Sequence, residues 1–211
     1  MQARRAAILE TASAMLHERP VADISLRELS DRVGLAKSNV LRYFDSREAI
    51  FLEVLDHNWT TWLDEIDAEL AALPKPGKGK YAREAQIAET IASSLTGKPL
   101  LCELISAMAA VLERNISVEF ARVFKRRATD NTGRLAAVIT REVPSLDDAG
   151  AGHFAGAVFV IVAGFWPYAN PTDVVATVMA EMGVPTADRM FVNGLTEGLV
   201  NQLVGLVARS G

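Results

Sequence analysis

A short segment near the N-terminus, residues 36–44, concentrates side chains that donate and accept hydrogen bonds: Lys37, Ser38, Asn39, Arg42 and Tyr43. If this segment is helical, Val40 and Phe44 share one face at i, i+4 spacing, which leaves the polar groups on the opposite face. Asn can pair with adenine through two hydrogen bonds, and Arg can reach guanine edges or phosphates. The segment is therefore suited to contact a partner, and its residue types can read base edges in the DNA major groove.

The chain before this polar face predicts two helices and a tight turn. Apolar residues at i, i+4, i+7 spacing indicate a first helix over residues 2–18. Ser25 and Glu28 have the spacing of a capping box, which opens a second, short helix. Gly34 can adopt the left-handed conformation that ends a helix without a steric penalty. Two short helices joined by a glycine turn are typical of the helix-turn-helix motif, whose second helix enters the major groove.

A long helix is predicted directly after the polar face. Asp45 and Glu48 have capping-box spacing at its start, and apolar residues recur every three or four positions up to about residue 73. Arg47 lies in the first turn, where free backbone amides and the helix dipole suit a phosphate oxygen. Strand signals are scarce, so the predicted fold class is all-α. The remaining helical patterns cover residues 81–95, 99–113, 117–142, 145–165, 172–182 and 186–209.

Length and composition restrict the class of protein. The 211 residues are 50% hydrophobic, which is enough to bury a sizeable core and excludes disorder as the main state. The net charge of −4 supplies no general attraction to nucleic acid, so any DNA contact must be local. Cys102 is the single cysteine, and Glu10 interrupts the apolar core that a secretory signal needs. We therefore expect a cytoplasmic protein without an intramolecular disulfide.

One uncharged run, residues 149–169, meets the nominal length of a membrane span. It consists largely of Gly and Ala, contains His153 and Pro167, and has no basic anchor on either side. We expect a helix buried in a bundle or a subunit interface, and no membrane partner. A membrane-associated or protein-interaction module is the alternative.

Catalytic patterns are absent from the sequence. The histidines at positions 17, 57 and 153 are scattered, and Cys102 has no histidine near it in the sequence. No glycine-rich phosphate loop and no metal-ligand cluster is present in the sequence. We predict that the protein is not an enzyme and that it uses no metal and no cofactor.

The stretch over residues 8–55 resembles the DNA-binding region of the TetR family of bacterial transcriptional regulators. The first helix, the capped second helix, the Gly34 turn, the pair Tyr43-Phe44 and the opening of the fourth helix at residues 46–49 occur in the order and spacing of the family. The resemblance implies a three-helix helix-turn-helix DNA-binding domain at residues 1–47. A larger helical ligand-binding and dimerisation domain would then occupy residues 48–211.

The resemblance also carries DNA contacts onto particular positions: Arg27, Lys37, Ser38, Asn39, Arg42, Tyr43 and Arg47. Two positions depart from the family pattern. Ala36 replaces the hydroxyl residue that commonly caps the recognition helix, which weakens that helix end by about 1 kcal/mol. Leu41 stands where tyrosine is very common, so a hydroxyl contact is lost and a thymine methyl becomes a possible neighbour.

The function implied by the resemblance is that of a homodimeric repressor, released from a palindromic operator by a small, mostly apolar molecule. A regulator without small-molecule control, or an activator, is the alternative. Basic and acidic residues balance over residues 1–55, so general attraction to DNA is weak. Binding must therefore rely on a dimer, whose two DNA-binding domains read half-sites about 34 Å apart.

Bulky side chains on the middle helices are candidates for the ligand pocket, although each also fits an ordinary core: Trp62, Met108, Phe120, Phe124, Phe165 and Trp166. Small residues at four-residue spacing let helices approach closely. They and their apolar neighbours are candidates for the dimer interface, with packing inside one chain as the alternative: Gly152, Gly156, Phe191, Gly194, Leu195, Gly198 and Leu199.

Overall fold

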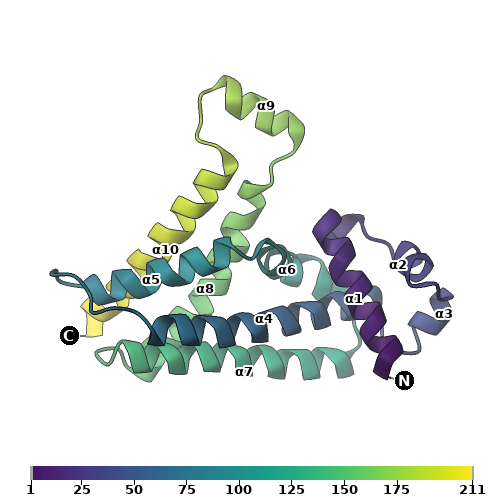
Figure 1. The fold of residues 1–211 in the computed structure, drawn as a ribbon, viewed down its shortest axis with the longest axis horizontal. Coiled ribbons are helices and arrows are strands. Elements are labelled where there is room, and N and C mark those ends of the chain that lie inside the picture. Colours follow the sequence, from purple (N-terminus) through teal and green to yellow (C-terminus); the bar gives the residue numbers. More distant parts are fainter. Residues whose placement is uncertain (1, 211) are drawn as a thin grey trace.

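The computed structural model describes residues 2–210, and this part of the chain is helical and contains no strand, so the all-α prediction is confirmed. Figure 1 shows the elements in order. They are α1 (Gln2–Glu18), η1 (Val21–Asp23), α2 (Leu26–Val33), α3 (Lys37–Val40), α4 (Arg47–Ala71), α5 (Ala82–Thr96), α6 (Pro99–Ala110), η2 (Leu112–Arg114), α7 (Val118–Glu142), α8 (Asp148–Ala169), α9 (Asp173–Glu181) and α10 (Ala187–Ser210).

Helix α4 links the two parts of the molecule. Near its start it packs against α1, and α1 and α2 with α3 form a small head at one end of the molecule (Figure 1). Further along, α4 lies beside α7 and against α6. Helices α8 and α10 pack on each other, and α8 also packs on α7 while α10 also packs on α5. The apolar periodicity predicted for α4 is the face that the structure buries: Phe51, Leu55, Trp59, Trp62, Ile66 and Leu70.

Ion pairs line the seam between α4 and α7. Each joins an aspartate of α4 to an arginine of α7, with nitrogen to oxygen distances of 3.3, 2.6 and 2.7 Å: Asp56 to Arg127, Asp64 to Arg134 and Asp67 to Arg141. All three arginines are about half exposed, so these pairs contribute little stability individually. The residue numbers of the three pairs rise together along α4 and α7, so the two helices run in the same direction at this seam.

The helix-turn-helix is stabilised by the capping box and the glycine turn that the sequence predicts. The Glu28 N–H donates to Ser25 Oγ at 3.2 Å, and the Ser25 N–H donates to Glu28 Oε2 at 2.9 Å, so both halves of the capping box are present. Gly34 has φ 73° and is left-handed at the end of α2. A residue with a Cβ would be strained in this conformation.

Replacing Ser25 by alanine should lower the free energy of unfolding by about 1 kcal/mol, because the first turn of α2 loses a side-chain acceptor. Urea denaturation followed by circular dichroism measures the change. Ser145→Ala is the matched control, since Ser145 is an exposed serine in a turn. Equal denaturation midpoints for both variants would contradict the assigned role of the capping box.

Two local predictions were wrong in detail. Helix α4 is capped by Ser46, whose Oγ accepts from the Ala49 N–H at 3.1 Å; Asp45 lies one residue too early to cap it. The recognition helix, expected over residues 36–44, is regular only as α3. After α3 the backbone tightens, because the Arg42 and Tyr43 N–H groups bond to carbonyls three residues back instead of four.

Helix α8 is the one helix within residues 2–210 that meets the length and composition of a membrane span by itself. A second candidate exists only if α5 and the following segment, bent by 91°, are taken as one broken span. A core helix can have the same composition. One side of α8 contributes Phe154, Val158 and Val162 to the interior, but only 33% of its most apolar 18-residue window is buried in this chain. The expected burial is therefore partial in the single chain.

Candidate nucleic-acid interface

The polar face predicted from the sequence lies on α3 and the turn after it. Lys37, Ser38 and Arg42 are exposed, and Asn39 and Tyr43 are half-buried. Within residues 2–210, none of these five side chains makes a hydrogen bond or an ion pair. Their donors and acceptors are therefore available to a partner outside the chain.

The opposite face of α3 fastens it to the head. Val40 and Phe44 are buried, and the Leu35 N–H bonds back to the Ser30 carbonyl across the Gly34 turn at 3.0 Å. Ala36, at the N-cap position of α3, supplies no side-chain hydrogen bond, as expected from this departure. Leu41 is 42% exposed beside the polar residues. The face that α3 presents to solvent thus combines free polar groups with one apolar side chain.

The two arginines outside α3 have different surroundings. The side chain of Arg27, in the first turn of α2, is 90% exposed, and its only described partner is Asp31 at 3.9 Å. Arg47 is instead occupied: it donates to the Ile24 carbonyl at 2.8 Å and, through Nε, to Glu48 Oε1 at 3.0 Å. Sequence reasoning missed this second role of Arg47, which holds the start of α4 to the segment preceding α2.

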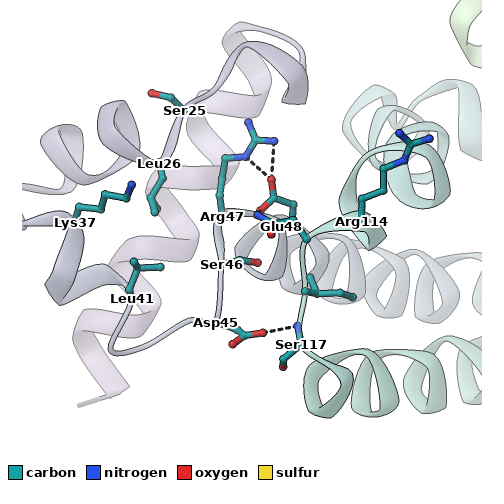
Figure 2. A pocket seen from close by; sticks show the side chains of 12 residues that line it. Ser25, Leu26, Lys37, Leu41, Asp45, Ser46, Arg47, Glu48, Arg114 and Ser117 are labelled. Atoms are coloured by element: carbon teal, nitrogen blue, oxygen red, sulfur yellow. Dashed lines mark hydrogen bonds and ion pairs between the residues drawn. The ribbon is translucent and has the colours of Figure 1, made fainter.

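A cleft of about 680 Å³ separates the head from the rest of the molecule, and Figure 2 shows its walls. Lys37 and Arg47 lie on the side of the head, and Arg114 lies on the other side. Asp45 Oδ2 accepts from the Ser117 N–H at 2.8 Å, where α7 begins. These two residues therefore join the head directly to α7.

A second contact crosses the same cleft. Asn115 Nδ2 donates to Glu48 Oε2 at 3.2 Å, and Glu48, the partner of Arg47, is buried. The residue pairs that cross the cleft are about 70 positions apart in the sequence, so no local pattern indicated them. These bonds fix the position of the head relative to the start of α7.

The Asp45 contact should make stability depend on pH. Hydrogen bonds from Ser117 hold the pKa of the Asp45 carboxyl below its ordinary value. A carboxyl whose pKa is lower in the folded state stabilises the fold above its unfolded pKa, and this contribution is lost as the pH falls through the folded pKa. Asp45→Ala should therefore be less stable than wild type at pH 7, and the difference should shrink as the pH falls below about 4.

Urea denaturation at pH 7 and at low pH tests this expectation. Asp23→Ala is the control, because Asp23 is an exposed aspartate of the head whose side chain has no described partner within residues 2–210. A difference between wild type and Asp45→Ala that stays constant with pH would contradict the assigned contact.

The six pocket candidates lie in several places. Phe120 and Phe124 stack with ring centroids 6.4 Å apart and line a groove of about 340 Å³ between α4 and α7. Trp62 is buried and donates to Ser94 Oγ at 3.0 Å. Trp166 donates to Glu103 Oε2 at 2.8 Å beside a different hollow. The remaining two are half-buried Met108, on α6, and Phe165, which is 36% exposed on α8.

The interface candidates on α10 pack inside this chain. Phe191, Leu195 and Leu199 belong to the core. A Cβ added to Gly194 would lie 2.5 Å from Phe165 Cε1, and one added to Gly198 would lie 3.3 Å from Ile161. These glycines let α10 approach α8 of the same chain, which favours packing inside one chain at these positions. A role in the dimer interface stays a prediction for Phe191, Gly194, Leu195, Gly198 and Leu199.

The two glycines of α8 have a different environment. A Cβ added to Gly152 or Gly156 would meet nothing within 4 Å. Val160, one turn after Gly156, is 72% exposed. The outward face of α8, defined by Gly152, Gly156 and Val160, is thus apolar and open.

Comparisons with known proteins agree with this architecture. A family model described as "Bacterial regulatory proteins, tetR family" matches residues 8–54, and one described as "Tetracyclin repressor-like, C-terminal domain" matches residues 56–210. Over 53 residues, 25% of this chain, the sequence is 43% identical to the HTH-type transcriptional regulator EthR of Mycobacterium tuberculosis. That match spans 24% of the length of EthR.

Two solved structures share the fold over nearly the whole chain. The transcriptional regulator FadR from Bacillus subtilis, in complex with stearoyl-CoA, has a TM-score of 0.56 at 13% identity, covering 93% of this chain and 97% of FadR. The TetR family repressor AlkX from Dietzia sp. has a TM-score of 0.53 at 17% identity, covering 96% of each chain. At these identities the likeness concerns the fold.

Proposed function

Because the chain belongs to the TetR family of bacterial transcriptional regulators, we propose that it is a homodimeric repressor that leaves its operator when a small, mostly apolar molecule binds. The members of this family regulate transcription and are not enzymes. The observation that carries the proposal is the exposed face of α3, whose polar side chains have no partner within residues 2–210. In this proposal residues 1–47 bind DNA, and residues 48–211 bind the effector and the second copy.

The head would place α3 in the major groove of operator DNA. The exposed or half-buried side chains then contact bases and phosphates: Arg27, Lys37, Ser38, Asn39, Arg42 and Tyr43. Arg47 would act mainly by holding the start of α4. The first backbone amides of α4 would then be available to a DNA phosphate. A protein that regulates transcription in this way would act in the cytoplasm.

Two copies would meet through the outward face of α8. Gly152 and Gly156 leave room for a close helix approach, and Val160 is largely exposed in the single chain. Helix α9 lies at the tip of the arm formed by α8 and α10 (Figure 1). Val174 on α9 and Met182 directly after it are 75% and 72% exposed. Apolar surface of this kind is typical of a protein interface.

The effector would be mostly apolar. The long apolar interior between α4, α6, α7 and α8 supports this, as do the two proteins of similar fold. FadR was solved in complex with stearoyl-CoA, and AlkX is implicated in the biodegradation of n-alkanes. Release from DNA requires only that the effector bind the DNA-incompetent conformation more tightly.

Selection of bound sequences from a random duplex library, at two salt concentrations and without ligand, tests DNA recognition. We expect an inverted repeat whose enrichment is lost in Asn39→Ala, since Asn39 lies on the exposed side of α3. No enrichment at low salt would overturn the repressor proposal. With the operator in hand, release by uncharged apolar molecules, tested beside the charged stearoyl-CoA, separates effector control from regulation without a small molecule.

A further inference from the structure

The indole nitrogen of Trp59 is a buried donor without an acceptor in the described chain. Trp59 is 3% exposed, and its Nε1 is shielded from solvent. A buried N–H without a partner is unfavourable relative to one that is hydrogen-bonded, because it has lost its bond to water and gained none in the protein. Such groups are rare in native proteins, and each one needs a physical explanation.

The surroundings of Trp59 are aromatic. Its ring lies 4.2 Å from that of Phe159 on α8, measured between centroids, with the planes tilted by 48°. Trp62, one turn later on α4, meets the same phenylalanine edge to face at 6.1 Å. The Trp62 indole donates to Ser94 Oγ, which itself donates to the Ile91 carbonyl. Of the two indoles at this cluster, only that of Trp59 has an unused donor.

We propose that the Trp59 N–H is the hydrogen-bond donor of the effector site, and that the effector is an uncharged, mostly apolar molecule with one acceptor such as a carbonyl oxygen. The proposal rests on the effector control proposed above and names the group that would recognise the effector. An acceptor on the ligand would satisfy the donor that the chain leaves unpaired. The ligand thereby gains from a bond that displaces no bond within the protein.

The polar groups near the cluster argue for an uncharged ligand. Asp56 precedes Trp59 by one turn, and it is occupied by Arg127 and by Asn131 Nδ2 at 3.3 Å each. Arg127 is thus already paired, and Asn131 is buried. Arg127 already balances the charge of Asp56 and is therefore not a free cation for a ligand carboxylate. An unpaired buried charge is strongly unfavourable, whereas a carbonyl needs only one donor.

The groove between α4 and α7 suggests how a ligand approaches. It is lined by Leu52, Phe120 and Phe124, and Phe124 is buried at its inner side. Leu52 and Trp59 are seven residues apart on α4, which places them on the same side of the helix two turns apart. Trp59 does not itself line the groove, so a ligand that entered there would have to displace side chains along α4 to reach the Trp59 indole.

The test compares octan-2-one with n-octane, two probes that differ mainly in one acceptor. Protein with 15N-labelled tryptophan shows indole N–H signals for Trp59, Trp62 and Trp166, and the Trp59 signal is the one absent from Trp59→Phe. Octan-2-one should move the Trp59 signal downfield, while n-octane should leave it without a downfield shift. A downfield shift of the Trp62 signal alone, or none at all with saturating ketone, would overturn the proposal.

Affinities provide a second readout that a merely structural role of Trp59 would not produce. Wild type should bind the ketone about three- to tenfold more tightly than the alkane, and Trp59→Phe should reduce this ratio to about one. Trp166→Phe is the control, because the Trp166 indole is already bonded to Glu103. The smaller side chain in Trp59→Phe changes the affinities for both probes alike. The ratio of the two affinities therefore reports the hydrogen bond alone.

Operator binding in the same samples separates the two proposals. If octan-2-one releases wild type and Trp59→Phe from the operator with equal potency, effector control stands and the assignment of Trp59 fails. If neither probe binds, the assignment fails as well. Failure of the free protein to bind any operator would instead refute the repressor function, independently of the indole signals.

Discussion

Replacement of Arg42 by alanine should lower operator affinity by roughly 2 to 6 kcal/mol per dimer. The estimate follows from 1 to 3 kcal/mol for a side chain that contacts a base, doubled because a dimer presents two copies to two half-sites. Arg42 is exposed at the end of the α3 region and has no partner within residues 2–210, so its loss removes no contact inside the head. The unfolding transition should stay unchanged.

Fluorescence anisotropy with the selected operator and with a scrambled duplex measures this effect. Binding to the scrambled duplex should fall much less, since a contact with a base edge contributes only where the sequence matches. Arg126→Ala removes the same charge from an exposed position on α7, far along the chain from the head, and should leave operator binding unaltered. Equal operator affinity for wild type and Arg42→Ala would remove Arg42 from the proposed interface.

Replacement of Val160 by glutamate should dissociate the dimer and abolish tight operator binding. Val160 is 72% exposed on the outward face of α8, so a carboxylate is fully hydrated there in the single chain. In a symmetric dimer the same carboxylate would be buried twice without a partner, at a cost of several kcal/mol for each copy. The variant should therefore keep its fold and lose its partner.

Analytical ultracentrifugation and circular dichroism separate the two effects. The expected result is a helical monomer with a normal unfolding transition and weak, salt-sensitive DNA binding from single heads. Val118→Glu places the same charge on a valine that is 66% exposed at the start of α7, and it should remain dimeric. A dimeric Val160→Glu would place the interface on another surface.

Much of the fold follows from the sequence because the signals are local. The Ser25 and Glu28 box, the left-handed Gly34 and the apolar face of α4 each depend on residues within a few positions of one another. The polar face of α3 was readable for the same reason: its spacing against Val40 determines which side chains face away from the core. The family match over residues 8–54 covers the capping box, the Gly34 turn and the start of α4.

The tertiary structure alone decided how these elements meet. Arg47 bonds to Ile24 instead of staying free, and Asp45 bonds to Ser117 at the start of α7 instead of capping α4. Both outcomes depend on segments that are distant in the sequence. The spacing of glycines predicts that a neighbouring helix can approach closely, but it does not identify that helix. At Gly194 the neighbour is Phe165 on α8 of the same chain. Helical periodicity specifies that a face is buried, but the choice of covering partner depends on the packing of the whole chain.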